Sequence, residues 1–157
     1  MKRFLIFALM CLLLGSCGSP KTTSVADSKA RVVGRTMTHD DGSVSFDWSG
    51  VYVDIRFRGS YLAIELSDTK RNYLNVWIDG EEQPKLTSEG EHTTLVLFDN
   101  PEAKGEHVVR IQKATEAEQG RITLHTITTD GRLLSTDELK RARHIEFYGD
   151  SLTCGYG

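Results

Sequence analysis

The middle of the chain alternates between apolar and polar residues with a period of two. Successive side chains of a β-strand point to opposite faces, so this alternation predicts strands that bury one face. It is clearest in residues 51–58, 62–67 and 73–78, and similar runs predict strands at 43–48, 93–98, 107–113 and 121–129. The apolar positions of the three clearest runs are Val51, Val53, Ile55, Phe57, Leu62, Ile64, Leu66, Leu74, Val76 and Ile78.

Short turn signals separate these runs, including Gly59-Ser60, Asp79-Gly80 and Asp130-Gly131. Many short strands with one apolar face predict an all-β fold of two antiparallel sheets packed face to face. We expect residues 31–142 to form this β-sandwich, with a jelly-roll topology. An immunoglobulin-type sandwich is the less favoured alternative, because the Cys…Trp…Cys pattern is absent. One short helix is expected within 135–143, where cap-forming residues precede acidic and then basic ones.

The first residues differ from the rest of the chain. Lys2 and Arg3 precede an apolar run, 4–14, that is too short to span a membrane, so residues 1–16 are interpreted as a signal peptide. Leu14-Gly15-Ser16-Cys17 resembles a bacterial lipobox, which implies that Cys17 carries lipid and becomes the new N-terminus. Ordinary secretory cleavage nearby is the alternative. Residues 17–30 are expected to be this lipidated cysteine and a flexible tether to the bacterial cell envelope, with periplasmic or cell-surface orientation left open.

The composition of the chain argues against several classes of binding partner and cofactor. The 157 residues carry a net charge of −3 and no run rich in lysine and arginine, so nucleic acid is not an expected partner. The three cysteines leave no pair for a disulfide, since Cys11 lies in the signal peptide and Cys154 stands alone. His-Glu-x-x-His and Cys-x-x-Cys motifs are absent, so neither a metal nor a cofactor is expected. We expect a monomer.

Near the end of the chain, the strand-like run 144–148 leads into Gly149-Asp150-Ser151. Glycine permits a tight turn, and a serine placed near a helix N-terminus meets free N–H groups that favour developing negative charge. This arrangement suits a serine that attacks an acyl group. The alternative is a surface turn with an ordinary serine.

The string 145–157 resembles the first block of SGNH (GDSL-type) hydrolases, in the version found in carbohydrate esterase family 2. Residues 42–52 and 75–80 also resemble the jelly-roll domain that precedes the hydrolase domain in that family. The resemblance implies that 143–157 form the first strand and nucleophile turn of an α/β hydrolase domain. It further implies that Ser151 is the nucleophile and a backbone oxyanion donor, with Gly149 and Asp150 supporting the motif. The implied substrates are acetylated poly- or oligosaccharides of plants.

The family pattern also includes an Asp-x-x-His block with the catalytic histidine and blocks with an oxyanion Gly and Asn. No Asp-x-x-His occurs in this sequence. The expectation is therefore a truncated hydrolase domain, and a 157-residue chain that is inactive by itself although its family is enzymatic. The competing hypothesis is a non-catalytic, lipid-anchored, carbohydrate-binding β-sandwich.

Aromatic side chains on the polar faces of strands are candidate sugar contacts. Trp77 and Tyr73 lie opposite Leu74, Val76 and Ile78 in the alternation, so both are expected on the exposed face. A purely structural role is the favoured alternative, since tryptophan and tyrosine are common half-buried strand residues. The weaker candidates of this kind are Trp48, Tyr52 and Tyr61.

Overall fold

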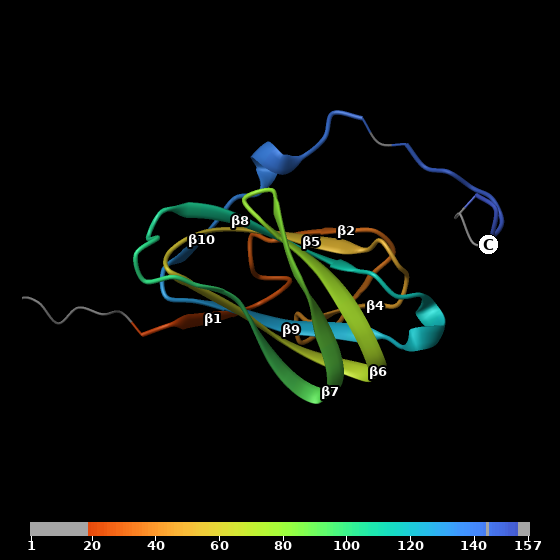
Figure 1. The fold of residues 1–157 in the computed structure, drawn as a ribbon, viewed down its shortest axis with the longest axis horizontal. Coiled ribbons are helices and arrows are strands. Elements are labelled where there is room, and N and C mark those ends of the chain that lie inside the picture. The colour runs from red at the N-terminus through yellow and green to blue at the C-terminus, as the bar shows by residue number, and fades with distance from the viewer. Residues whose placement is uncertain (1–18, 144, 154–157) are drawn as a thin grey trace, which may run out of the picture.

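The computed structural model describes residues 19–143 and 145–153, and the described part is almost entirely β-strand (Figure 1). Two short 3₁₀ turns are the only helical elements in these ranges. No helix within them is long and apolar enough to cross a membrane. The elements are β1 (Lys21–Ser24), β2 (Arg31–Val33), β3 (Met37–Thr38), β4 (Val44–Phe46), β5 (Tyr52–Arg58), β6 (Tyr61–Ile78), β7 (Glu81–Asp99), β8 (Glu106–Lys113), η1 (Ala117–Gln119), β9 (Ile122–Thr129), β10 (Arg132–Leu134) and η2 (Asp137–Leu139).

The strands form one curled, wholly antiparallel sheet whose two halves pack as layers. Strand β6 belongs to both layers, because its first half pairs with β9 and its second half pairs with β8. Strand β7 pairs with β6 along most of the length of β6. One layer continues from β9 to β1, β4 and β3, and the other from β8 to β5, β2 and β10. The expected jelly-roll β-sandwich is confirmed, with the β6–β7 hairpin as the joint between its layers (Figure 1).

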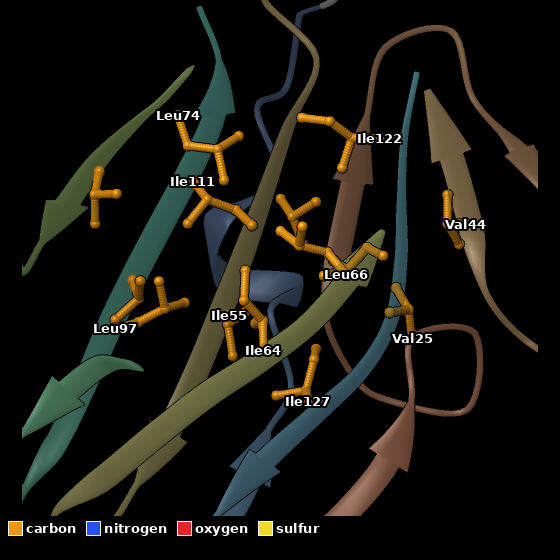
Figure 2. Close-up of a cluster of buried hydrophobic side chains, with 14 of the residues drawn as sticks. Val25, Val44, Ile55, Ile64, Leu66, Leu74, Leu97, Ile111, Ile122 and Ile127 are labelled. Atoms are coloured by element: carbon orange, nitrogen blue, oxygen red, sulfur yellow. The ribbon is translucent and has the colours of Figure 1, made fainter. Parts of the chain in front are cut away.

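Most of the core consists of apolar positions that the alternation predicted, as Figure 2 shows for a cluster that includes Ile55 and Ile64. Val25 is an addition to that set, and Ile78 is only partly buried. Each fully buried side chain of this size contributes roughly 1.5–3 kcal/mol relative to exposure. The buried members of the core are Val25, Val44, Phe46, Val51, Val53, Ile55, Phe57, Leu62, Ile64, Leu66, Leu74, Val76, Leu97, Val109, Ile111, Ile122, Leu124 and Ile127.

The expected flexible tether is wrong from Lys21 onward. Residues 21–24 form β1 on the edge of β9, and Val25 is only 2% exposed, so the sandwich begins at Lys21 and not near residue 31. An edge strand gains its stability from backbone hydrogen bonds, which any residue except proline can make. The polar sequence of β1 therefore carries no period-two signal.

The short helix expected within 135–143 is also wrong. Only a single 3₁₀ turn forms at Asp137–Leu139, in which the Asp137 carboxylate accepts a hydrogen bond from Ser135 Oγ at 2.7 Å. A segment this short gains too few helical hydrogen bonds to offset the cost of nucleation. Contacts with β2 and its neighbours hold it instead: Arg31 donates to the Leu139 carbonyl at 2.6 Å, and the Thr136 hydroxyl donates to the Lys29 carbonyl at 2.9 Å.

A buried polar cluster lies where β6 passes from one layer to the other, among the register shifts around Asp68. The Asp68 carboxylate accepts hydrogen bonds from Asn72 Nδ2 at 2.9 and 3.0 Å and from Ser88 Oγ at 2.7 Å. Nearby, the buried Lys113 ammonium donates to the carbonyls of Thr115 and Glu116 at 2.6 and 2.8 Å, and burial lowers its pKa. Burying an unpaired polar group costs free energy, so these hydrogen bonds stabilise β6 at the point where it passes between the layers.

Candidate functional site

The segment that carries Ser151 leads away from the sandwich (Figure 1). Residues 145–148 are not assigned to a strand, in contrast to the expected first strand of a hydrolase sheet. Their apolar side chains are strongly exposed, with Phe147 at 82%. Large apolar side chains gathered on a surface usually mark a contact with another protein layer. None of the described strands pairs with the backbone of this segment.

The turn around Ser151 is locally defined. A Cβ atom at Gly149 would overlap the side chain of Thr153, so a larger residue there would require Thr153 to move. The Asp150 carboxylate accepts a hydrogen bond from the Leu152 backbone N–H at 3.0 Å, which closes a turn over 151–153. Gly149 and Asp150 therefore lie in one locally defined turn with Ser151.

A tyrosine and a glutamate precede this turn. The Tyr148 hydroxyl donates to Glu146 Oε2 at 2.5 Å, and this hydrogen bond raises the pKa of Tyr148. Neither group bonds to the Ser151 hydroxyl, for which the described residues provide no hydrogen-bond partner. A serine hydroxyl is a weak nucleophile until a base takes its proton.

Four of the five histidines are described, and each is engaged within the sandwich. His39 and His125 bond to serine hydroxyls, each at 2.9 Å. His92 faces Glu65 at 3.4 Å, and His107 bonds to Asp79 at 2.7 Å. None of them bonds to Ser151. The expected lipidation site Cys17, like His144 and Cys154, lies outside the described residues. In residues 19–143 and 145–153, no group of three or more His, Cys, Asp or Glu could hold a metal ion.

The two aromatic residues singled out from the sequence lie on the outer face of β6. Tyr73 is 41% exposed, and the Arg71 guanidinium lies 5.8 Å from the centre of its ring. Trp77 is half-buried and pairs in register with Arg110 of β8. Both therefore lie on the solvent side of the layer, as the alternation predicts.

The sequence analysis did not predict the ion pair that lies beneath this face. Asp54 is only 1% exposed. Arg110 donates two hydrogen bonds to the Asp54 carboxylate, from Nε at 2.6 Å and from a terminal nitrogen at 3.0 Å. This pairing raises the pKa of Arg110. The Arg110 guanidinium also lies 4.1 Å from the centre of the Tyr52 ring, a close cation–π contact. We call Tyr52, Arg110 and Trp77 the aromatic platform. Only the register of β5, β8 and β6 reveals that these three residues are neighbours.

Comparison with known proteins places the sandwich in a family. A family model described as carbohydrate esterase 2 N-terminal matches residues 32–136, well over half of the chain. The chain is also 32% identical over 138 residues to the acetylxylan esterase / glucomannan deacetylase of Cellvibrio japonicus (strain Ueda107). That alignment covers 87% of this chain but 38% of the relative, so the chain spans well under half of the relative's length.

Solved structures share the same architecture over a similar range. A family two carbohydrate esterase from Clostridium thermocellum, in complex with cellohexaose, matches with a TM-score of 0.72 and 29% identity, covering 82% of this chain and 39% of that one. A family two carbohydrate esterase from Cellvibrio japonicus matches with a TM-score of 0.68 and 30% identity, covering 74% and 35%. With its sandwich shared by both esterases and matched by the family model, the chain belongs to the carbohydrate esterase 2 N-terminal family.

Proposed function

We propose that this chain is the N-terminal part of a secreted carbohydrate esterase that removes acetyl groups from plant polysaccharides. The observation that carries the proposal is the Gly149-Asp150-Ser151 turn directly after a carbohydrate esterase 2 N-terminal domain. The Cellvibrio japonicus relative, named as an acetylxylan esterase and glucomannan deacetylase, supports acetylated xylan and glucomannan as substrates.

In the proposed reaction, Ser151 Oγ attacks the carbonyl carbon of a sugar acetate. A histidine takes the hydroxyl proton and passes it to the departing sugar oxygen, which leaves an acetyl-serine. Water then attacks the acetyl group, releases acetate and restores the hydroxyl. The Ser151 backbone N–H, which makes no backbone hydrogen bond with the described residues, would donate to the oxyanion in both steps.

The catalytic base is the component that residues 1–157 do not supply in this proposal. The four described histidines are held by Ser45, Glu65, Ser67 and Asp79. The exposed apolar run at 145–148 supports a further layer of protein packed against the segment, which would bring the base and the other oxyanion donors. We therefore expect Ser151 to act only in that context.

The aromatic platform favours a second candidate function, in which the sandwich binds polysaccharide without acting on it. Aromatic rings pack on the apolar faces of sugars, and a fixed guanidinium next to them can donate hydrogen bonds to hydroxyl groups. The Asp54 carboxylate holds Arg110 in one orientation, which would make it suitable for this role.

Acetate release distinguishes the two candidates. The protein produced from its own gene should release acetate from acetylated xylan, whereas residues 1–157 alone should not hydrolyse p-nitrophenyl acetate through Ser151. The acetate is measured enzymatically, and p-nitrophenol by absorbance. Adsorption to insoluble xylan with no acetate released by the gene product would favour the second candidate and contradict the first.

We further propose that Cys17 carries the lipid that anchors the protein to the cell envelope. The support is the Leu14-Gly15-Ser16-Cys17 sequence after a charged and apolar leader. In bacteria grown with labelled palmitate, the protein should take up label and the Cys17→Ala variant should not. The Cys154→Ala variant is the matched control and should label normally. Undiminished labelling of Cys17→Ala would refute the anchor.

A further inference from the structure

An open hollow of about 230 Å³ lies where β1 and the turn after it approach the start of β10. Three cationic side chains line it, from Lys21, Lys29 and Arg132, together with one acid, Asp27. Thr23 adds a hydroxyl group that donates no hydrogen bond within the described residues. The three cations come from separate parts of the sequence, so no run of basic residues in the sequence predicts the cluster. We call it the basic hollow.

None of the three cations forms an ion pair within the described ranges. The one acid in the hollow, Asp27, accepts a hydrogen bond from Ser24 Oγ at 2.7 Å. Part of its carboxylate is therefore already used as an acceptor within its own loop. Arginines elsewhere on the sandwich do face carboxylates, namely Arg31, Arg56, Arg58, Arg71 and Arg110. Arg35 and Arg121 also form no ion pair in the described part of the chain, but neither lines the basic hollow, which gathers three unpaired cations in a chain of net charge −3.

Like charges that share a hollow repel each other, and a bound anion removes that repulsion. Lysine ammonium and arginine guanidinium groups both donate to the oxygens of a phosphate, and a hydroxyl such as that of Thr23 adds a further donor. The basic hollow therefore has the charge and the donors for an exposed, singly charged phosphate group.

The position of the basic hollow identifies the source of that phosphate. Lys21 follows Cys17 by four residues, so their Cα atoms are at most ~14 Å apart even in an extended chain. An acyl group on Cys17 would therefore keep the Lys21 end of the hollow close to the membrane surface. The field of an anionic membrane falls off within a Debye length of about 8–10 Å, so these cations would lie within or just beyond its range.

We propose that the basic hollow binds the phosphate of an anionic phospholipid and so orients the sandwich against the membrane. This inference rests on the proposed lipid anchor at Cys17. A single acyl group gives weak and reversible attachment, and a basic patch is the usual second contribution. A fixed contact through the hollow would also direct the opposite end of the sandwich away from the lipid.

The test uses soluble protein that begins at Ser19, which contains every described strand and the whole core. Its sedimentation is measured with vesicles of equal parts phosphatidylglycerol and phosphatidylcholine, and with vesicles of phosphatidylcholine alone. Each cation near an anionic surface strengthens binding about fivefold, so the Lys21→Ala/Lys29→Ala/Arg132→Ala variant should bind on the order of a hundredfold more weakly. The unchanged protein should prefer the phosphatidylglycerol vesicles.

The matched control is the Lys85→Ala/Lys104→Ala/Arg121→Ala variant, which removes the same charge from exposed positions outside the basic hollow. It should bind nearly as well as the unchanged protein. An equal loss in both variants would mean that binding follows net charge alone, and this would overturn the proposal. So would equal binding to the two kinds of vesicle. Thermal unfolding of each variant verifies that the sandwich is intact.

A further arm replaces the vesicles with polygalacturonate, whose carboxylates offer the same charge in a polysaccharide. Binding to polygalacturonate that depends on the hollow, without binding to vesicles, would overturn the phospholipid assignment. The protein in these assays lacks Cys17, so their outcome is independent of lipid attachment. Labelling with palmitate tests the anchor separately, and the acetate assay tests the esterase.

Discussion

Replacing Ile64 by aspartate is expected to unfold the sandwich at ambient temperature. Ile64 is 1% exposed in the first half of β6, where it pairs in register with Leu95 of β7 and Ile127 of β9. The exchange loses roughly 1.5–3 kcal/mol of apolar burial and places an unpaired carboxylate in the core, which costs several kcal/mol more. Together these losses approach the entire stability of an ordinary domain, about 5–15 kcal/mol.

Circular dichroism during thermal and urea unfolding measures this effect. The control is Val96→Asp, which makes the same kind of exchange at a half-exposed position of β7 and should change stability by no more than about 1 kcal/mol. An Ile64→Asp protein with an unchanged unfolding transition would mean that β6 has the wrong register in this account.

Replacing Ser151 by alanine is expected to lower kcat of the protein made from its own gene by on the order of 10⁴-fold or more. Loss of a serine nucleophile removes the covalent route and leaves only the contribution of binding and of the oxyanion donors. The KM for acetylated substrate should change little, because the hydroxyl is small and adds little to substrate binding. Unfolding should also be unchanged, since Ser151 is exposed.

The matched control for this experiment is Ser49→Ala, which removes another exposed turn serine that is remote from the motif in sequence. Its kcat should match that of the unchanged protein. If Ser151→Ala retained most of its activity, another residue would have to be the nucleophile. A similar loss in both variants would point to a general defect in the protein and not to chemistry at Ser151.

The sandwich core could be predicted from the sequence because a period of two has one structural interpretation. Ile55, Leu62 and Leu74 all lie where the alternation placed them. The β1 strand could not be predicted, because pairing with β9 depends on backbone hydrogen bonds and not on side-chain pattern. The helix at 135–143 was predicted from capping residues and from the order of its charges, and these cannot stabilise a segment of one turn.

The proposed functional surfaces also differ in how far the sequence alone predicts them. The glycine and aspartate beside Ser151 could be predicted as turn residues, since their roles are local in the chain. The aromatic platform depends on which residues of β5, β8 and β6 lie side by side, and the sequence does not specify that register. The basic hollow likewise joins residues from β1, the following turn and β10, so no linear motif contains it.

Labelling with a fluorophosphonate tests most directly the central claim that Ser151 is the acyl-transfer nucleophile. This reagent forms a stable bond to a serine that a base activates, and mass spectrometry of the digested protein locates the adduct. With the protein made from its own gene, the account predicts one adduct, at Ser151, and complete loss of labelling in Ser151→Ala. An adduct on a different serine, in a protein that releases acetate while Ser151 stays unmodified, would contradict it.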